Sequence, residues 1–193
     1  MPNQKKRLLS VLMILVLIIA VYPVKSSATQ QVYTVSVTPV QQFQSNWCWA
    51  ACAEMAGKSK YPSSSRGQLQ VVNHLFGTYD NPYPNVEGSL QNSATGSTYV
   101  TYNNYSYSYT YSTWTFSQIA TSIQQGNAVQ TALGYYTSAG RNGGHMILIY
   151  EIHLSYNMVS FIDPGDGLSH TCGFSSLQNG SYNGGFYDQT VYL

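Results

Sequence analysis

The sequence predicts an α+β protein in which helices come first and an antiparallel sheet follows. Apolar residues recur at helical spacing in three segments between residues 47 and 125. The last third instead holds short runs rich in Val, Ile, Tyr and Thr, separated by turns. Helical segments followed by strands indicate an α+β architecture, and the roughly 165 residues beyond the N-terminal segment suit one domain.

The first 28 residues have the pattern of a secretory signal peptide. Basic residues at positions 5–7 precede an apolar run over residues 8–22, and small residues end the segment at Ala28. We expect cleavage after Ala28, which leaves residues 29–193 as one secreted, extracellular domain without stable membrane association. An uncleaved anchor is the alternative, because the apolar run is nearly long enough to span a bilayer.

Charged residues are scarce in the predicted domain. Four basic residues and seven acidic ones give residues 29–193 a net charge of −3 with histidine neutral. Proteins that bind nucleic acid or anionic membranes need a basic surface, which these residues do not supply. We therefore exclude DNA, RNA and anionic membrane surfaces as main partners.

The first predicted helix starts near Trp47, where Ser45 and Asn46 offer capping oxygens, and ends at Gly57. It is apolar on nearly all sides, so we expect it to be buried. Cys48 lies in its first turn, where unpaired backbone N–H groups and the helix dipole favour a thiolate. Cys52 lies one turn further and fits a buried, inert thiol better.

Two more helices are expected, over residues 69–76 and 116–125, each with a capping box before it and a glycine after it. Residues 78–98 contain several Pro and Gly residues and are expected to form a loop. In residues 105–111, tyrosines alternate with polar residues, so a strand there has four tyrosines on one face. We expect that face to pack on the helix over 116–125, with an exposed platform for sugar or peptide as the alternative.

The last third is expected to form strands. Their ranges, together with a short N-terminal strand or arm, are 31–37, 128–136, 145–154, 158–163, 168–174 and 189–193. A tight turn near Asn157 joins two of these strands into a hairpin. His145 starts the first strand of that hairpin and Asp163 ends the second, so both residues are expected at the same end of the sheet.

A thiolate nucleophile needs an imidazolium beside it and a third group that orients the imidazole. His145 is the best candidate because it follows two glycines at the rim of the predicted sheet. The weaker candidates are His74, His153 and His170, which lie in an amphipathic helix, near the far turn and in a polar strand. The spacing of His and Cys matches no metal motif, so no metal or cofactor is expected.

An acyl-transfer site also needs hydrogen-bond donors for the developing oxyanion. The backbone N–H of Cys48 is one, and the side-chain amide of Gln42 or Gln44 is the other. The three cysteines allow at most one disulfide, so one thiol is left over. Cys52 and Cys172 either form that disulfide or stay as inert thiols.

Three stretches together resemble the papain-like cysteine peptidases: residues 42–51 around Cys48, residues 143–149 around His145 and residues 161–164 around Asp163. The order glutamine, cysteine, histidine, acid is that of the family. Within it, the chain is similar to compact bacterial members, the staphopains and the peptidase domains that process bacteriocin leaders.

The resemblance implies a papain-like fold, with a helical N-terminal half that carries the nucleophile helix and a C-terminal antiparallel sheet half. It implies Cys48 as nucleophile, His145 as general base and acid, and Asp163 as orienting group. It favours Gln42 over Gln44 as oxyanion donor. A protein or peptide substrate follows from the same resemblance, and we expect a monomer.

The chain also departs from the plant-type pattern. His145 follows Cys48 by 97 residues, against about 130 to 150 in plant-type members. Asp163 stands where those enzymes have asparagine, and the segment before Gln42 is too short for a long inhibitory propeptide.

The leading interpretation is a secreted cysteine peptidase. One alternative is a peptidoglycan amidase or acyl transferase that uses the same residues. Another is a non-catalytic binding or adhesion domain that uses the tyrosine-rich strand.

Overall fold

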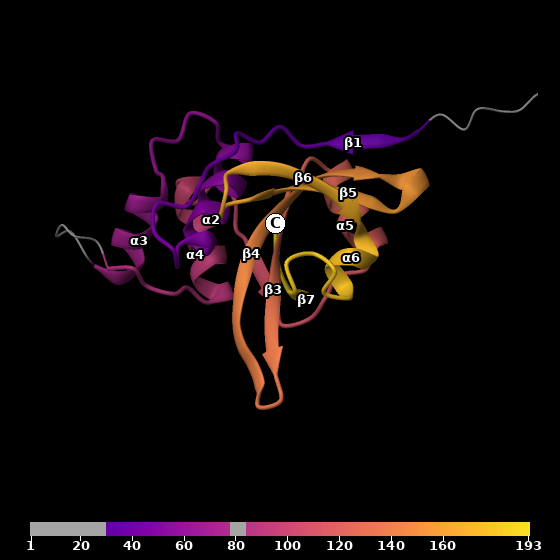
Figure 1. Ribbon diagram of the computed structural model, residues 1–193. Helices are drawn as coiled ribbons and strands as arrows, with labels where there is room; N and C mark the ends of the chain where they lie inside the picture. The colour runs from indigo at the N-terminus through magenta and orange to yellow at the C-terminus, as the bar shows by residue number, and fades with distance from the viewer. Residues whose placement is uncertain (1–29, 78–83) are drawn as a thin grey trace, which may run out of the picture.

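The computed structural model of the protein describes residues 30–77 and 84–193. The predicted signal peptide, residues 1–28, lies outside these residues. The structure has the predicted α+β architecture, with most of its helices in the first half of the chain and most of its strands in the second (Figure 1). Within the described ranges, no helix has the length and apolar character needed to cross a bilayer.

Helices lie on both sides of the sheet (Figure 1). On one side are α2 (Cys48–Lys60), α3 (Gln68–Phe76) and α4 (Leu90–Val100). On the other side are α5 (Phe116–Gln124) and the short α6 (Phe174–Gln178). Of these, α2 carries Cys48 at its N-terminus and packs against β3 and β4 of the sheet.

The sheet is antiparallel throughout and has the order β2-β7-β3-β4-β5-β6. Its strands are β1 (Val32–Thr34), β2 (Ser108–Thr110), β3 (Val129–Thr137), β4 (Gly140–His153), β5 (Met158–Asp163), β6 (Leu168–Gly173) and β7 (Phe186–Tyr192). Strand β1 pairs with Glu151–His153, the last residues of β4. Strand β3 pairs with β4 only as far as Ile149, so the two strands do not compete for the same residues. The hairpin of β3 and β4 extends past the rest of the sheet (Figure 1).

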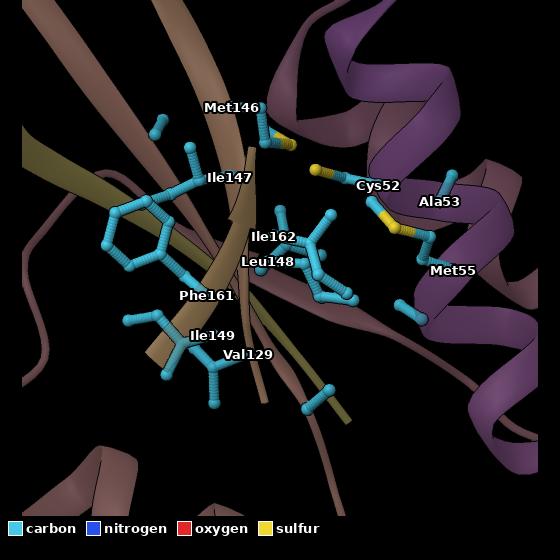
Figure 2. Packing of buried hydrophobic residues seen from close by; sticks show 14 of the residues in the cluster. Cys52, Ala53, Met55, Val129, Met146, Ile147, Leu148, Ile149, Phe161 and Ile162 are labelled. Atoms are coloured by element: carbon cyan, nitrogen blue, oxygen red, sulfur yellow. The ribbon is translucent and has the colours of Figure 1, made fainter. Parts of the chain in front are cut away.

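The central strands are apolar on both faces, because helices cover both. Figure 2 shows Cys52 and Met55 of α2 pointing toward Met146, Leu148 and Ile162 on one face of the sheet. The labelled residues on the other face are Val129, Ile147, Ile149 and Phe161. Near-continuous apolar runs are the pattern of strands buried on both sides, and this burial holds the site-bearing ends of β4 and β5 in place.

The predicted turn near Asn157 is present. Residues 154–156 form a short 3-10 turn, and Asn157 follows with a left-handed backbone conformation (φ 49°). The hairpin pairs Leu148 with Ile162, which puts Asp163 opposite Ile147. Because side chains alternate between faces, Asp163 and His145 lie on the same face at the same end of the sheet.

The first predicted helix is longer than expected, since α2 continues past Gly57 to Lys60. Gly57 has another role in the packing. A Cβ at this position would lie 2.5 Å from side-chain atoms of Val100, so the glycine permits the close approach of α4.

Helix α4 was not expected, because residues 78–98 were predicted to form a loop. Its sequence is polar and contains a glycine, which lowers helix propensity. Ser89 starts the helix with a capping box, since its hydroxyl accepts from the N–H of Asn92 and the Asn92 side chain accepts from the N–H of Ser89. Gly96 packs against Val71 and Ala53, so tertiary packing outweighs propensity here.

The tyrosine-rich segment contains only the short strand β2, and it packs on α4 rather than on the helix over 116–125. Tyr107 points inward and its hydroxyl donates to the carbonyl of Ala56 in α2. Tyr109 and Tyr111 are exposed. The expectation of four tyrosines on one buried face is therefore wrong.

Candidate active site

Cys48 is the first residue of α2, and its side chain is half-buried. The first N–H groups of a helix have no partner within the helix, so the N–H of Cys48 is available to a ligand. Neither Ser45 nor Asn46 caps the helix as predicted. Both bind Asn85 instead, through a 2.7 Å bond to the Ser45 hydroxyl and a 2.8 Å bond from the Asn46 N–H.

The predicted contact between His145 and Asp163 is present. Nε2 of His145 lies 2.5 Å from Oδ1 of Asp163, which also accepts from the N–H of Gly165. The other carboxylate oxygen, Oδ2, accepts from the hydroxyl of Tyr182 at 2.8 Å. Asp163 is only 4% exposed, so all of its strong partners come from the protein.

Cys48 and His145 line the same cleft, and interaction with the Cys48 side chain helps to raise the pKa of His145. Because Nε2 is bound to Asp163, Nδ1 is the ring nitrogen left for the sulfur. The imidazole is therefore a neighbour of both the thiol and the carboxylate. This is the arrangement in which one histidine exchanges a proton with a nucleophile while an acid fixes the ring.

The surroundings keep both ring and carboxylate charged. Burial acts to lower the pKa of His145, but hydrogen bonds and negative charge from Asp163 and Cys48 outweigh it and raise the pKa to about 10. Burial acts to raise the pKa of Asp163, but the bonds from His145, Gly165 and Tyr182 lower it to about 2. At neutral pH the pair is an imidazolium and a carboxylate.

Gln42 lies beside the loop that follows Asp163, since its N–H donates to the carbonyl of Pro164 at 2.8 Å. Its side-chain amide Nε2 donates to the carbonyls of Gln44 and Ser45, at 3.0 and 2.7 Å. Oε1 is buried and has no partner. The alternative candidate, Gln44, has an exposed side chain.

Gln68 fixes the backbone on both sides of Gln42. It is fully buried, its Oε1 accepts from the N–H of Phe43 at 3.0 Å, and its Nε2 donates to the carbonyl of Gln41 at 2.9 Å. Glu54 of α2 accepts from the N–H of Gln68 in turn. The segment that holds Gln42 is thus tied to the nucleophile helix.

A cleft of about 480 Å³ opens between the helical half and the sheet half, and both Cys48 and His145 line it. Its wall on the helical side includes Trp49, Glu87, Gly88 and Leu90; its wall on the sheet side includes Ala132, Tyr135, Arg141 and Met146. This volume is in the range of sites that bind small ligands or segments of peptide.

All three cysteines are free thiols, so the possible disulfide between Cys52 and Cys172 is not formed. Burial and the negative charges of Cys48 and Asp163 raise the pKa of Cys52. Burial also raises the pKa of Cys172. Both results fit the inert-thiol interpretation. In residues 30–77 and 84–193, no group of three or more His, Cys, Asp or Glu side chains could hold a metal ion.

The other histidines are occupied elsewhere. His74 stacks on Tyr99 with ring centroids 4.0 Å apart. His153 bonds Glu151 and His170 bonds Asp166. None of these histidines lines the cleft.

Sequence reasoning missed the roles of Tyr182, Gln68 and Tyr135 at this site. Tyr182 lies in a loop with no motif of its own, and Gln68 was assigned to a capping box because it precedes an apolar run. Tyr135 lies at the cleft, where burial together with the charges of Asp163 and Cys48 raises its pKa. No motif in β3 pointed to Tyr135.

Comparisons with known proteins bear on the family and the fold. Residues 34–184 match the model of the Peptidase_C39 like family. Among solved structures, the fold is similar to that of a double glycine motif protease from an AMS/PCAT transporter, solved in complex with its leader peptide. The TM-score is 0.50 over 83% of this chain and 93% of that chain, with 9% sequence identity, so this likeness concerns the fold alone. A search of curated proteins finds no match.

Proposed function

The chain belongs to the Peptidase_C39 like family and is a papain-like cysteine peptidase, and from this premise we propose that Cys48, His145 and Asp163 are its catalytic triad. Cys48 is the nucleophile, His145 the general base and acid, and Asp163 the group that orients the imidazole. The protein hydrolyses peptide bonds by this mechanism. The observation that carries the proposal is the position of His145 beside both the Cys48 thiol and the Asp163 carboxylate, at the cleft.

The reaction proceeds in two steps. The Cys48 thiolate attacks the peptide carbonyl, and the tetrahedral intermediate collapses to a thioester as Nδ1–H of His145 gives its proton to the leaving amine. Water then attacks the thioester, His145 accepts a proton from it, and the carboxylic acid leaves as the Cys48 thiolate and the His145 imidazolium are restored. Asp163 stays ionised and holds the ring through Nε2 in both steps.

The oxyanion of each tetrahedral intermediate needs donors that are already in place. The N–H of Cys48 at the start of α2 supplies one. Gln42 supplies the second through Nε2, whose two hydrogens now reach the carbonyls of Gln44 and Ser45. This role requires the Gln42 amide to release one of these carbonyls, so that one N–H is free for the oxyanion.

A peptide substrate is supported by the cleft and by the protease of similar fold, which was solved in complex with a leader peptide. The test is turnover of an unstructured protein such as casein, with analysis of the new termini. Cys48→Ala and His145→Ala are expected to lower turnover by several orders of magnitude while the fold is kept. Cys172→Ala is the matched control and is expected to retain activity.

Two results would contradict the assignment. Full activity in the Cys48→Ala or His145→Ala variant would remove these residues from the mechanism. Release of wall peptides from peptidoglycan without any cleavage of proteins would favour an amidase that uses the same triad.

We also propose that the protein is exported by residues 1–28 and acts outside the cell as a monomer. The basic, apolar and small-residue pattern of that segment supports export. N-terminal sequencing of the protein from culture medium is expected to start at Thr29, and sedimentation is expected to give the mass of one chain. An N-terminus that keeps the apolar run would indicate an anchor instead.

A further inference from the structure

Glu87 stands out among the acidic residues of the described ranges because it has no cationic partner. The other five each lie within ion-pair distance of a Lys, Arg or His: Glu54 with Lys58, Glu151 with His153, Asp163 with His145, Asp166 with His170 and Asp188 with Arg141. Glu87 is exposed and lines the cleft that contains Cys48 and His145.

The loop that carries Glu87 is held at a fixed position relative to the nucleophile. Trp47 and Trp49, on either side of Cys48, donate through their indole Nε1 to the carbonyls of Pro84 and Val86, both at 3.2 Å.

Gly88, the residue after Glu87, lies against the Trp49 ring. A Cβ on Gly88 would come within 2.2 Å of Cδ2 of that ring, so only glycine allows this contact. Asn46 also bonds Asn85 of the same loop twice, at 2.8 and 3.1 Å. Glu87 is therefore carried by a loop that the start of α2 holds beside Cys48.

The charges in the cleft are otherwise balanced. Apart from Glu87 and the triad residues, the charged residue that lines the cleft is Arg141. Its Nε bonds Asp188 at 2.8 Å, so its charge is compensated. The charge of His145 is compensated by Asp163. A carboxylate of the substrate would be repelled by Glu87 and would find no uncompensated cation among the residues that line the cleft. A cationic group of the substrate would instead pair with the Glu87 carboxylate.

Aromatic residues of the cleft favour the same ligand. Tyr111 is 70% exposed and lines the cleft, and half-buried Tyr135 lines it too. The faces of tyrosine rings attract ammonium and guanidinium groups. Burial and nearby negative charge keep the Tyr135 phenol protonated, because they raise its pKa.

We propose that Glu87 forms a subsite for a cationic side chain of the peptide substrate, Lys or Arg, close to the bond that is cut. This inference rests on the proposed function, since it assigns the specificity of the same cleft. Glu87 is a specificity residue: it binds the substrate and takes no part in the proton transfers.

The test uses two synthetic peptide libraries and the full protein. One library is acetylated at its N-termini and contains Lys and Arg; the other has free N-termini and contains neither. The wild type, Glu87→Gln and Glu151→Gln digest both libraries, and mass spectrometry gives the cleaved bonds and their relative kcat/KM. Glu151→Gln is the matched control because Glu151 is the same residue type, is paired with His153 and does not line the cleft.

In the acetylated library, the wild type and Glu151→Gln are expected to cut bonds next to Lys or Arg with about fivefold higher kcat/KM than bonds in neutral sequences, as for a solvent-accessible ion pair of about 1 kcal/mol. Glu87→Gln is expected to lose most of this preference. The wild-type preference is also expected to weaken at high ionic strength, because salt screens an exposed pair.

Three results would overturn the inference. The wild type could cleave without a preference for basic residues, or Glu87→Gln could keep the wild-type preference. Selection confined to the library with free N-termini would assign the subsite to a terminal ammonium instead. If the wild type cuts neither library, the proposed function fails, and the subsite is then judged by binding. Immobilised Cys48→Ala protein is expected to retain a Lys peptide about fivefold more tightly than its Gln counterpart, and the double variant with Glu87→Gln is not. Equal retention of both peptides by Cys48→Ala would overturn the inference independently of catalysis.

Discussion

Nε2 of His145 lies 2.5 Å from Oδ1 of Asp163, although the two residues are 18 positions apart in the chain. The hairpin of β4 and β5 brings them together on one face of the sheet. The carboxylate is held in turn by Tyr182 and the Gly165 N–H. The imidazole is therefore oriented by a carboxylate that is itself held by the backbone two residues further on and by a tyrosine 19 positions away.

Replacement of Asp163 by Asn is expected to shift the pH dependence of activity. The pKa of His145 is raised in the native protein, so the imidazolium persists well above pH 6.5 and is lost as pH rises through about 10. Asp163→Asn removes the negative charge that raises this pKa, so the alkaline limb of kcat/KM is expected to move to lower pH. The pKa of Asp163 is lowered to about 2, so its carboxylate stays ionised throughout the measured range. A pH–rate profile from pH 4 to 10 checks this, and an unchanged alkaline limb would contradict it.

Tyr182→Phe is expected to reduce kcat and leave KM nearly unchanged. The variant keeps the ring contact with Phe161 but removes the O–H that donates to Oδ2 of Asp163. A hydrogen bond to a charged group contributes about 1.5–3 kcal/mol, so the unfolding free energy at neutral pH is expected to fall by about that amount. Tyr150→Phe removes a hydroxyl that bonds only Ser169 and is the control. A Tyr182→Phe variant that is less stable but has the wild-type kcat would show a purely structural role.

Gln68→Leu is expected to lower kcat, because Gln68 holds the backbone on either side of the proposed oxyanion donor Gln42. The loss of its two bonds leaves the Phe43 N–H and the Gln41 carbonyl, both only partly buried, without this partner. The expected effect on stability is therefore smaller than the about 1–3 kcal/mol of a fully buried unsatisfied group. Gln130→Leu is the control, since Gln130 is equally buried and bonds Ser93 and Ser97. Both variants are expected to lose stability in urea unfolding. If both also lose kcat to the same extent, Gln68 has no special role in positioning Gln42.

Gly88→Ala is expected to impair substrate binding as well as stability. The new Cβ would lie 2.2 Å from Cδ2 of Trp49, so the loop that forms one wall of the cleft must move. Overpacking of this kind lowers stability by about 1–3 kcal/mol. Gly173→Ala is the control, because its Cβ would meet nothing closer than the Ser175 hydroxyl at 3.6 Å and its φ is −60°. Measurement of KM and of the unfolding midpoint checks both effects, and an unchanged KM in Gly88→Ala would contradict the role of this loop.

The sequence predicted the elements whose local pattern and tertiary environment agree. The buried helix at Cys48, the capping box at Thr115 and the hairpin through Asn157 are all present. The order of strands along the hairpin was enough to place His145 and Asp163 at the same end of the sheet. Their place on the same face also depends on a register shift between Ile149 and Glu151, which the sequence did not reveal.

The remaining features depend on contacts that a single sequence does not reveal. Helix α4 is polar and contains Gly96, and it forms because that glycine fits against Val71 and Ala53. Asn46 was expected to cap α2 but bonds Asn85, a residue 39 positions away. Tyr182 donates to Asp163 from the loop between α6 and β7. In each case the partner lies far away in the chain.

The central claim, that the Cys48 thiol and the His145 imidazole act as a charged couple, is tested most directly by the alkylation rate of Cys48. Native protein is treated with iodoacetamide at neutral pH, and peptide mapping follows Cys48, with Cys172 as the internal reference. We expect Cys48 to react much faster than Cys172 in the wild type and to become slow in His145→Ala, because the imidazolium stabilises the thiolate. Equal rates for Cys48 in the two proteins, or a Cys48 as slow as Cys172 in the wild type, would contradict the claim.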